Sequence, residues 1–178
     1  MTGQASSSWR HPPNPLSHCP EMHAAETRKD ARCGGIRVEL VGMLGNARCS
    51  VQTDIGYGDV VTPAAELLKF RPLLDDNPGA VIKAYPRETV IAEKLEAIVS
   101  LGMANSRMKD FFDLHILVSD FTNDRASAAN AIRRTFERRG VPITESLPVG
   151  LSDDFAMDRT KQIQWNAFLR RTSSRLPF

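Results

Sequence analysis

Alternation of hydrophobic and polar residues begins at Gly34 and marks the first predicted secondary structure of the chain. Two alternating runs occupy residues 36–40 and 49–55. A period of two is typical of strands with one buried face. Because Gly45 and Asn46 lie between the two runs, the pattern predicts an antiparallel hairpin that turns at these residues.

The period becomes helical from Thr89 onward. Apolar residues recur every three to four positions as far as Gly102, which predicts a helix that ends at this glycine. A second helix is predicted from an N-cap at Ser106, with Met108 and His115 facing the core. Further elements are predicted at three places: a short strand over 81–85, a helix over 127–139 and a helix over 158–170. Strands precede helices along the chain, so the predicted class is α+β.

Segments broken by proline lie outside these elements. Residues 1–25 contain several prolines and few aliphatic side chains, so they are predicted to form a disordered N-terminal tail. Residues 59–83 are predicted to be mostly connection for the same reason. A second tail is predicted over 172–178, which leaves 26–171 as the folded part.

Composition and charge favour a soluble protein. The 178 residues suffice for a domain with a core, and the formal net charge of +2 argues against a strongly basic nucleic-acid-binding protein. The odd number of cysteines argues against a disulfide framework. No apolar run approaches the roughly 20 residues needed to cross a bilayer, and no signal-peptide pattern is present. We therefore predict a cytoplasmic protein without a membrane partner.

Lys94 is the first candidate for a chemical role. It lies beside the apolar stripe of its predicted helix, from where it could reach along the edge of a cleft and bind a phosphate group. The alternative is an ordinary surface lysine that pairs with a neighbouring acid such as Glu93 or Glu96.

Asp110 and Asp113 are three residues apart and share one face of the next predicted helix. Two carboxylates on one face could bind a metal ion or divide the roles of acid and base. The alternative is a salt-bridged first turn, in which Asp110 pairs with Arg107 and Asp113 pairs with Lys109.

Asp54 is the third candidate, at the end of the second predicted strand. A strand-borne carboxylate followed by glycines could hold Mg²⁺ for phosphoryl chemistry. The alternative is a solvent-facing residue before a glycine turn.

Several segments form a longer ordered pattern: GGIRV (34–38), DIGYGD (54–59), AYPRETVIAEKLEA (84–97), NSRMKDFFDL (105–114), TFERR (135–139) and Gln164-Trp165. In this order they resemble the AbiEii/AbiGii toxin family of nucleotidyltransferases over about residues 26–171. The resemblance implies a DNA-polymerase-β-like sheet followed by a helical C-terminal part. It also implies a toxin of type IV toxin–antitoxin and phage-abortive systems, which transfers a nucleotide from a nucleoside triphosphate to tRNA or another RNA with Mg²⁺ and has a cognate antitoxin.

The same resemblance implies roles for three residues. Lys94 corresponds to the catalytic lysine that binds the nucleotide phosphates, Asp110 to the catalytic carboxylate, and Asp54 to the strand-borne metal ligand. The family's first motif, a Gly-Ser or Gly-Gly pair followed by Asp-x-Asp, has no counterpart in residues 1–33. We therefore expect an N-terminally truncated enzyme with weak Mg²⁺ binding and crippled turnover. The alternative expectation is a non-catalytic remnant that binds an antitoxin or RNA.

Overall fold

The computed structural model describes residues 22–27, 34–44, 46–72, 79–119 and 125–173. The chain separates into two compact units, one that ends at Gly58 and one that begins at Asp59. The stretch 26–171, predicted as one folded part, is thus divided between two units, each with its own sheet.

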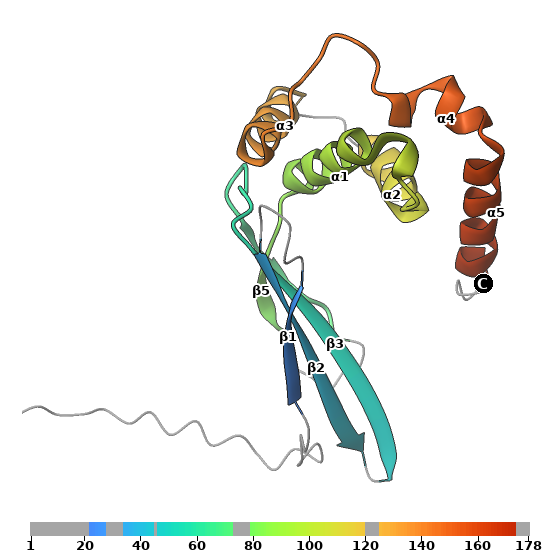
Figure 1. Ribbon diagram of the computed structural model, residues 1–178. Coiled ribbons are helices and arrows are strands. Elements are labelled where there is room, and N and C mark those ends of the chain that lie inside the picture. Colours follow the sequence, from blue (N-terminus) through green and yellow to red (C-terminus); the bar gives the residue numbers. More distant parts are fainter. Residues whose placement is uncertain (1–21, 28–33, 45, 73–78, 120–124, 174–178) are drawn as a thin grey trace, which may run out of the picture. The chain divides into compact units, whose positions relative to one another are not determined.

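The first unit is a three-stranded antiparallel sheet in the order β1-β2-β3 (Figure 1). Its strands are β1 (Met22–Thr27), β2 (Gly34–Leu44) and β3 (Ala47–Tyr57). The predicted hairpin is confirmed, because β2 and β3 pair along their whole length and Leu44 faces Ala47. Gly45, one of the two predicted turn residues, lies outside the described residues.

Strand β1 corrects the predicted extent of the N-terminal tail. Residues 22–25 were expected to be disordered, yet they pair with β2, with Met22 opposite Leu40. Their backbone hydrogen bonds come from a strand that follows later in the chain, which local composition does not reveal. Residues 1–21 lie outside the described residues. At the other end, the last helix continues to Ser173, past the predicted start of the second tail at 172.

The second unit begins with the two-stranded sheet formed by β4 (Glu66–Lys69) and β5 (Val81–Ala84). The predicted strand over 81–85 is confirmed. Strand β4 was expected to be connection, because its sequence Glu-Leu-Leu-Lys shows no alternation. Pairing with β5 determines its extended conformation.

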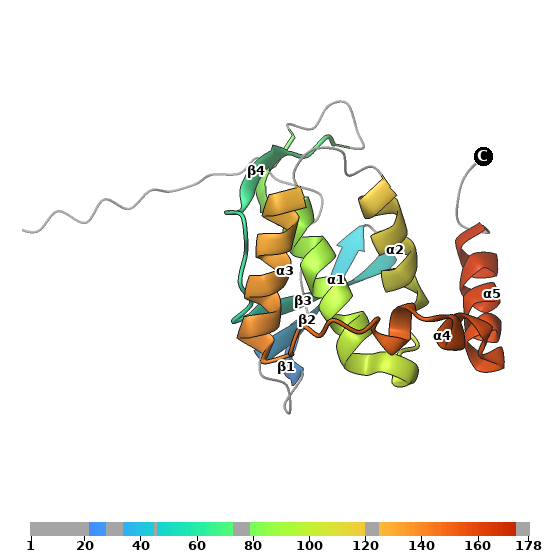
Figure 2. The same cartoon turned by 90° about the horizontal axis from the view of Figure 1, so that it is seen from above.

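Helices make up the rest of the second unit: α1 (Arg87–Leu101), the 3-10 turn η1 (Gly102–Ala104), α2 (Met108–Ser119), α3 (Arg125–Arg139), the 3-10 turn η2 (Val149–Leu151), α4 (Asp153–Met157) and α5 (Arg159–Ser173). The three predicted long helices and the one begun near Ser106 are therefore confirmed. Helix α1 lies between α3 and α2, and α5 packs against α2 and α4 (Figure 2). None of the helices in the described ranges is long and apolar enough to span a bilayer.

The core of this unit surrounds α1. Its buried hydrophobic residues come from α1, α2, α3 and α4: Ile91, Ala92, Ile98, Met108, Ala131, Phe136 and Phe155. His115 was expected in the core with Met108, but it is exposed. Helix α2 is most buried at Met108 and becomes more exposed towards its C-terminal turns. A core centred on α1 therefore fixes how the start of α2 is presented.

Candidate functional site

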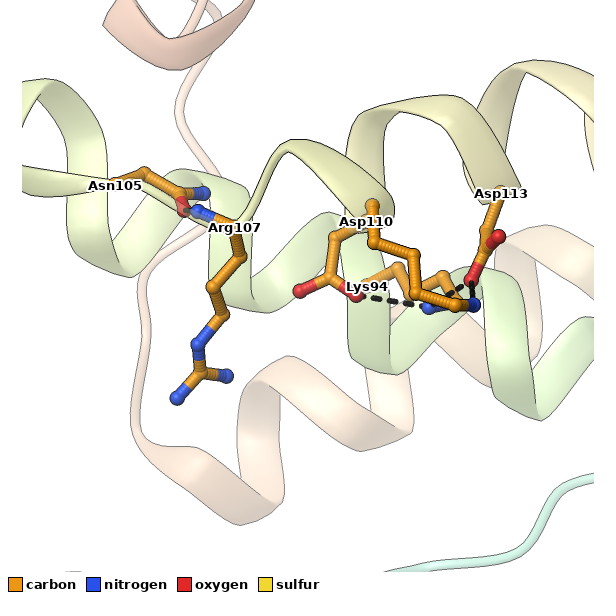
Figure 3. A network of polar contacts seen from close by, with 6 residues as sticks. Lys94, Asn105, Arg107, Asp110 and Asp113 are labelled. Carbon is orange, nitrogen blue, oxygen red and sulfur yellow. Dashed lines mark hydrogen bonds and ion pairs between the residues drawn. The ribbon is translucent and has the colours of Figure 1, made fainter. Parts of the chain in front are cut away.

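Lys94 connects helices α1 and α2 through two carboxylates. Its Nζ lies 2.8 Å from Oδ1 of Asp110 and 2.8 Å from Oδ2 of Asp113. Figure 3 shows the ammonium group between the two acids, while the second oxygen of Asp110 points away from it. The Lys94 side chain is only 18% exposed. The candidate lysine and the two candidate carboxylates are thus in direct contact.

Lys109 completes this cluster of four charged side chains, which we call the Lys94 cluster. Lys109 lies one turn before Asp113 on the same helix and pairs with it, as the salt-bridge alternative predicted, and its side chain is 72% exposed. Asp110 pairs with Lys94 and not with Arg107, the partner that the salt-bridge alternative predicted. The neighbouring-acid alternative for Lys94 is therefore not what the structure shows: its partners come from the next helix.

Burial and pairing act in opposite directions on the charged groups of this cluster. Burial alone would lower the pKa of Lys94, but hydrogen bonds to Asp110 and Asp113 outweigh it and raise that pKa. Burial would likewise raise the pKa of Asp113, yet hydrogen bonds from Lys109 and Lys94 leave it lowered. Pairing therefore favours the charged forms of Lys94 and Asp113.

The turn between α1 and α2 positions these carboxylates. Helix α1 ends at Leu101 and is capped by Gly102, whose φ of 48° favours glycine. Asn105, fully buried, accepts a hydrogen bond from the Arg107 amide on its side-chain oxygen at 2.8 Å (Figure 3). Ser106 was expected to cap this helix, but the side-chain acceptor at its start is Asn105. The Nζ of Lys161 in α5 also donates to the Asn105 main-chain oxygen at 2.8 Å.

Asp110 borders a groove of about 830 Å³ between the start of α2 and the face of α5. Three basic side chains, Arg107, Lys109 and Arg171, also line it. The remaining lining residues are Ser106, Met108, Ile163, Gln164, Ala167, Phe168 and Thr172. Lys94 is not among the lining residues, so within the described chain it contacts Asp110 from the α1 side. A phosphate group in this groove would meet Arg107 or Lys109 before Lys94.

A second charged contact links α3 to α1. Arg139, at the end of α3, pairs with Glu96 of α1 and places Nη2 2.9 Å from Oδ1 of Asp59. Glu96 is 5% exposed and also accepts a hydrogen bond from Ser100. These pairs raise the pKa of Arg139 despite the opposing effect of burial. The partners of Arg139 lie 43 and 80 positions away in the sequence, so its role is visible only in the structure.

Asp54 belongs to the first unit and is paired across the sheet. It faces Arg37 of β2 in the strand register. Nε of Arg37 lies 2.7 Å from Oδ1, and Nη2 lies 2.9 Å from Oδ2. The Asp54 side chain remains 53% exposed. Both of its carboxylate oxygens thus accept hydrogen bonds from one arginine.

The comparison with protein families decides the ancestry of the chain. A family model described as nucleotidyl transferase AbiEii toxin, type IV TA system, matches residues 18–177. The chain belongs to the AbiEii toxin family. The match extends over both units and confirms the resemblance found in the sequence. A search of the curated proteins and a search of the solved structures each returned no match.

Membership of the AbiEii family makes a divalent metal ion a natural cofactor, because metal ions neutralise the charge that develops in phosphoryl transfer. The described residues contain no group of three or more His, Cys, Asp or Glu side chains placed to hold such an ion. Asp54, the predicted ligand, offers no oxygen that is not already bonded to Arg37. The described residues therefore do not fit a metal centre as they stand.

Proposed function

We propose that this AbiEii family member transfers a nucleotide from a nucleoside triphosphate to an RNA acceptor, with Asp110 as the catalytic carboxylate. The observation that supports this most directly is the contact between Lys94 and Asp110 at the edge of a basic groove. The contact brings together the two residues to which the family pattern gives the phosphate-binding and catalytic roles. They come from separate helices, so the contact is not a consequence of their sequence spacing.

Asp110 is suited to receive a proton from the attacking hydroxyl group of the acceptor. Lys94 holds Oδ1, while Oδ2 has no hydrogen-bond partner among the described residues and points away from the lysine (Figure 3). A carboxylate fixed through one oxygen can present the other to a hydroxyl group in a defined direction. The groove beside it supplies arginine and lysine donors for the phosphates of the nucleic acid.

In this proposal Lys94 must bind the triphosphate although it already contacts two carboxylates, those of Asp110 and Asp113. Its ammonium group has three donors, and two of them face Asp110 and Asp113. To bind a triphosphate oxygen, Lys94 uses its third donor or releases one carboxylate. Asp113, also paired with Lys109, is the carboxylate that keeps a partner when Lys94 turns away.

Incubation of the chain with labelled nucleoside triphosphates, RNA and a divalent metal ion tests the proposal. Wild type is expected to label RNA only slowly, because its described residues form no metal centre, and Asp110→Asn to lose about a hundredfold or more of that activity. Lys94→Ala should lose about a hundredfold, because a donor to the phosphates is removed. Lys83→Ala is the matched control, since it removes an exposed lysine of β5 that lies in neither the groove nor the Lys94 cluster. A wild-type protein that labels no RNA, or an Asp110→Asn variant as active as wild type, would contradict the proposal.

A second candidate is a non-catalytic module that binds RNA, for which the observation is the groove lined by Arg107, Lys109 and Arg171. Three cations along one groove can contact successive phosphates. This candidate predicts salt-sensitive RNA binding without any nucleotide transfer, and binding that weakens in Arg107→Ala while Asp110→Asn leaves it intact. A cognate antitoxin is the other partner that the family implies, and a stable complex with it in place of RNA would refute this candidate.

A further inference from the structure

A second cavity lies beside the groove and has a different character. It measures about 340 Å³ and is formed mainly by α2, α4 and α5. Its walls carry three aromatic side chains, Phe111, Phe155 and Trp165, and one buried lysine, Lys161. We call it the aromatic pocket. Its volume lies in the range of pockets that hold small ligands.

The rings of this pocket are arranged to meet a flat ligand. Phe111 and Phe155 stack with their centroids 5.0 Å apart and their planes inclined by 28°. Trp165 also lines this pocket, and the centroid of its ring lies 5.6 Å from that of Phe168, a residue of the neighbouring groove. Aromatic side chains bind nucleobases by stacking, because every base has a π-face. The walls alone therefore favour a planar aromatic ring over a flexible chain.

Lys161 gives the pocket its one buried charge. Its side chain is 7% exposed, and its Nζ donates to the Asn105 main-chain oxygen at 2.8 Å. The same ammonium group lies 5.2 Å from the centroid of the Phe155 ring. An ammonium group carries three donors, and the described residues provide this one with a single hydrogen-bond acceptor and no carboxylate. A buried cation of this kind is stabilised by any ligand that brings an oxygen acceptor into the pocket.

We propose that the aromatic pocket binds a nucleobase that carries a ring carbonyl oxygen, and that Lys161 donates a hydrogen bond to this oxygen. Uracil, cytosine and guanine have such an oxygen, whereas adenine has none. The pocket thus selects by stacking for a base and by Lys161 for a carbonyl. Binding of a base to the pocket does not depend on the proposed nucleotidyl transfer. Only the assignment of that base to the donor nucleotide or to the acceptor RNA rests on the proposed function.

The position of the pocket connects this base to the reacting groups. Met108 lines both the aromatic pocket and the groove that contains Asp110. A base bound in the aromatic pocket therefore lies next to the groove, and its sugar and phosphate can extend past Met108 towards the cations of the groove. The base belongs either to the incoming nucleoside triphosphate or to a nucleoside of the acceptor RNA, and both have the same recognised chemistry.

Trp165 provides a direct readout. The chain has two tryptophans, and Trp9→Phe leaves Trp165 as the only one. Titration of this variant with UMP is expected to quench the fluorescence of Trp165 in a saturable manner, and AMP should bind at least about tenfold more weakly because it lacks the carbonyl. UTP and a short oligouridylate are titrated in parallel. Tighter binding of UTP assigns the base to the donor nucleotide, and tighter binding of the oligouridylate assigns it to the acceptor.

Two substitutions separate a pocket from a surface effect. Ala156→Leu places a larger side chain in the pocket, where Ala156 is a lining residue, and should abolish the quench. Ala129→Leu on the exposed surface of α3 is the matched control and should leave it unchanged. Lys161→Met is expected to remove the preference for UMP over AMP, whereas a purely structural lysine would weaken both equally. Lys161→Arg retains donors and should keep the preference. Thermal melts confirm that each variant is folded.

The proposal is overturned if UMP causes no saturable quench, if Ala156→Leu binds as well as wild type, or if AMP binds as tightly as UMP. Nucleotide transfer plays no part in this measurement. A chain that binds UMP but labels no RNA would therefore retain the aromatic pocket and lose the proposed function. A chain that labels RNA but shows no saturable quench with UMP would support the proposed function and refute base binding in the aromatic pocket.

Discussion

Nζ of Lys94 on helix α1 lies 2.8 Å from Oδ1 of Asp110 on helix α2, and both side chains are largely buried. The contact joins two residues that are sixteen positions apart in the sequence. It places the catalytic candidate on the wall of a groove and the lysine behind it. The consequences for stability can be measured separately from those for activity.

Removal of the Lys94 ammonium group should destabilise the fold. Lys94→Met leaves Asp110 and Asp113 partly buried without their shared donor, and we expect a loss of about 1–3 kcal/mol in the free energy of unfolding. Lys109→Ala removes only the exposed member of the cluster and should cost less than about 1 kcal/mol. Urea denaturation of the two variants measures both values. Equal losses would mean that burial of the Lys94 cluster contributes nothing.

The pH dependence of stability should reflect Asp113 on the acid side. The pKa of Asp113 is lowered from its ordinary value of 3.8, so this carboxylate stabilises the fold above that value. Its contribution is lost as the pH falls through the lower pKa of the folded state. The difference in unfolding free energy between wild type and Asp113→Asn should therefore shrink as the pH decreases from neutral to below 3.8. A difference that stays constant over this range would contradict the pairing.

On the alkaline side, the raised pKa of Lys94 gives the opposite pH dependence: its contribution to stability is lost as the pH rises. Its contribution is complete below the ordinary value of 10.5 and is lost as the pH rises through the higher folded pKa. Wild type and Lys94→Met should therefore converge in stability only above pH 10.5. Circular dichroism of urea-unfolded and native samples across this range follows the convergence.

Arg139 should be among the most sensitive positions of the second unit. Arg139→Met leaves Glu96 buried without a cation, for which we expect a loss of about 3–5 kcal/mol in unfolding free energy. Arg139→Lys keeps the charge but cannot reach Glu96 and Asp59 with one planar group, so its loss should be intermediate. Arg134→Ala, an exposed arginine of the same helix, is the control and should change stability by less than about 0.5 kcal/mol. If thermal melts show that Arg139→Met is no less stable than this control, Arg139 does not stabilise the fold through Glu96.

Asp54 should contribute no metal binding while Arg37 occupies both of its oxygens. Titration with Mn²⁺, followed by electron paramagnetic resonance, is expected to give the same binding curve for wild type and Asp54→Asn. Arg37→Ala removes these two hydrogen bonds and is the variant in which Mn²⁺ binding is expected to depend on Asp54. Weaker Mn²⁺ binding by Asp54→Asn than by wild type would show that the arginine yields to the metal ion.

Gly150 should not accept a side chain. A Cβ atom there would lie 2.8 Å from Cγ2 and 2.9 Å from the main-chain oxygen of Ile98, which is fully buried in α1. Gly150→Ala should therefore cost about 1–3 kcal/mol in unfolding free energy. At Gly42 the same substitution meets its nearest atom at 3.7 Å, an ordinary contact, and should be tolerated. Chemical denaturation of both variants distinguishes the two positions.

The sequence predicts those features that depend on local periodicity. The hairpin of β2 and β3 and the helical stripe of α1 have a period that one segment can show by itself. Strands β1 and β4 lack such a period, because each is extended only through pairing with another strand. Local pattern therefore finds the regular elements and misses those that depend on a partner.

The candidate site shows the same division. Lys94 and Asp110 could be named from their helices and the family pattern, although the lysine's position behind the groove could not. The contact of Lys161 with Asn105 spans 56 positions, and that of Arg139 with Asp59 spans 80. These contacts form when the helices pack around α1, and local sequence spacing does not predict contacts between residues so far apart in the chain. The role of Asp54 depends on the family pattern, and the sequence alone does not show that Arg37 is its partner.

The Lys94 cluster has one consequence for how a substrate is first encountered. Its two ammonium groups and two carboxylates cancel, so the cluster carries no net charge. Such a group orients a ligand at hydrogen-bond distance but exerts little attraction beyond the Debye length, which is about 10 Å at 0.1 M salt. Attraction over longer distances falls to the arginines of the groove. The cluster itself would recognise a nucleotide on contact and would not draw it in from solution.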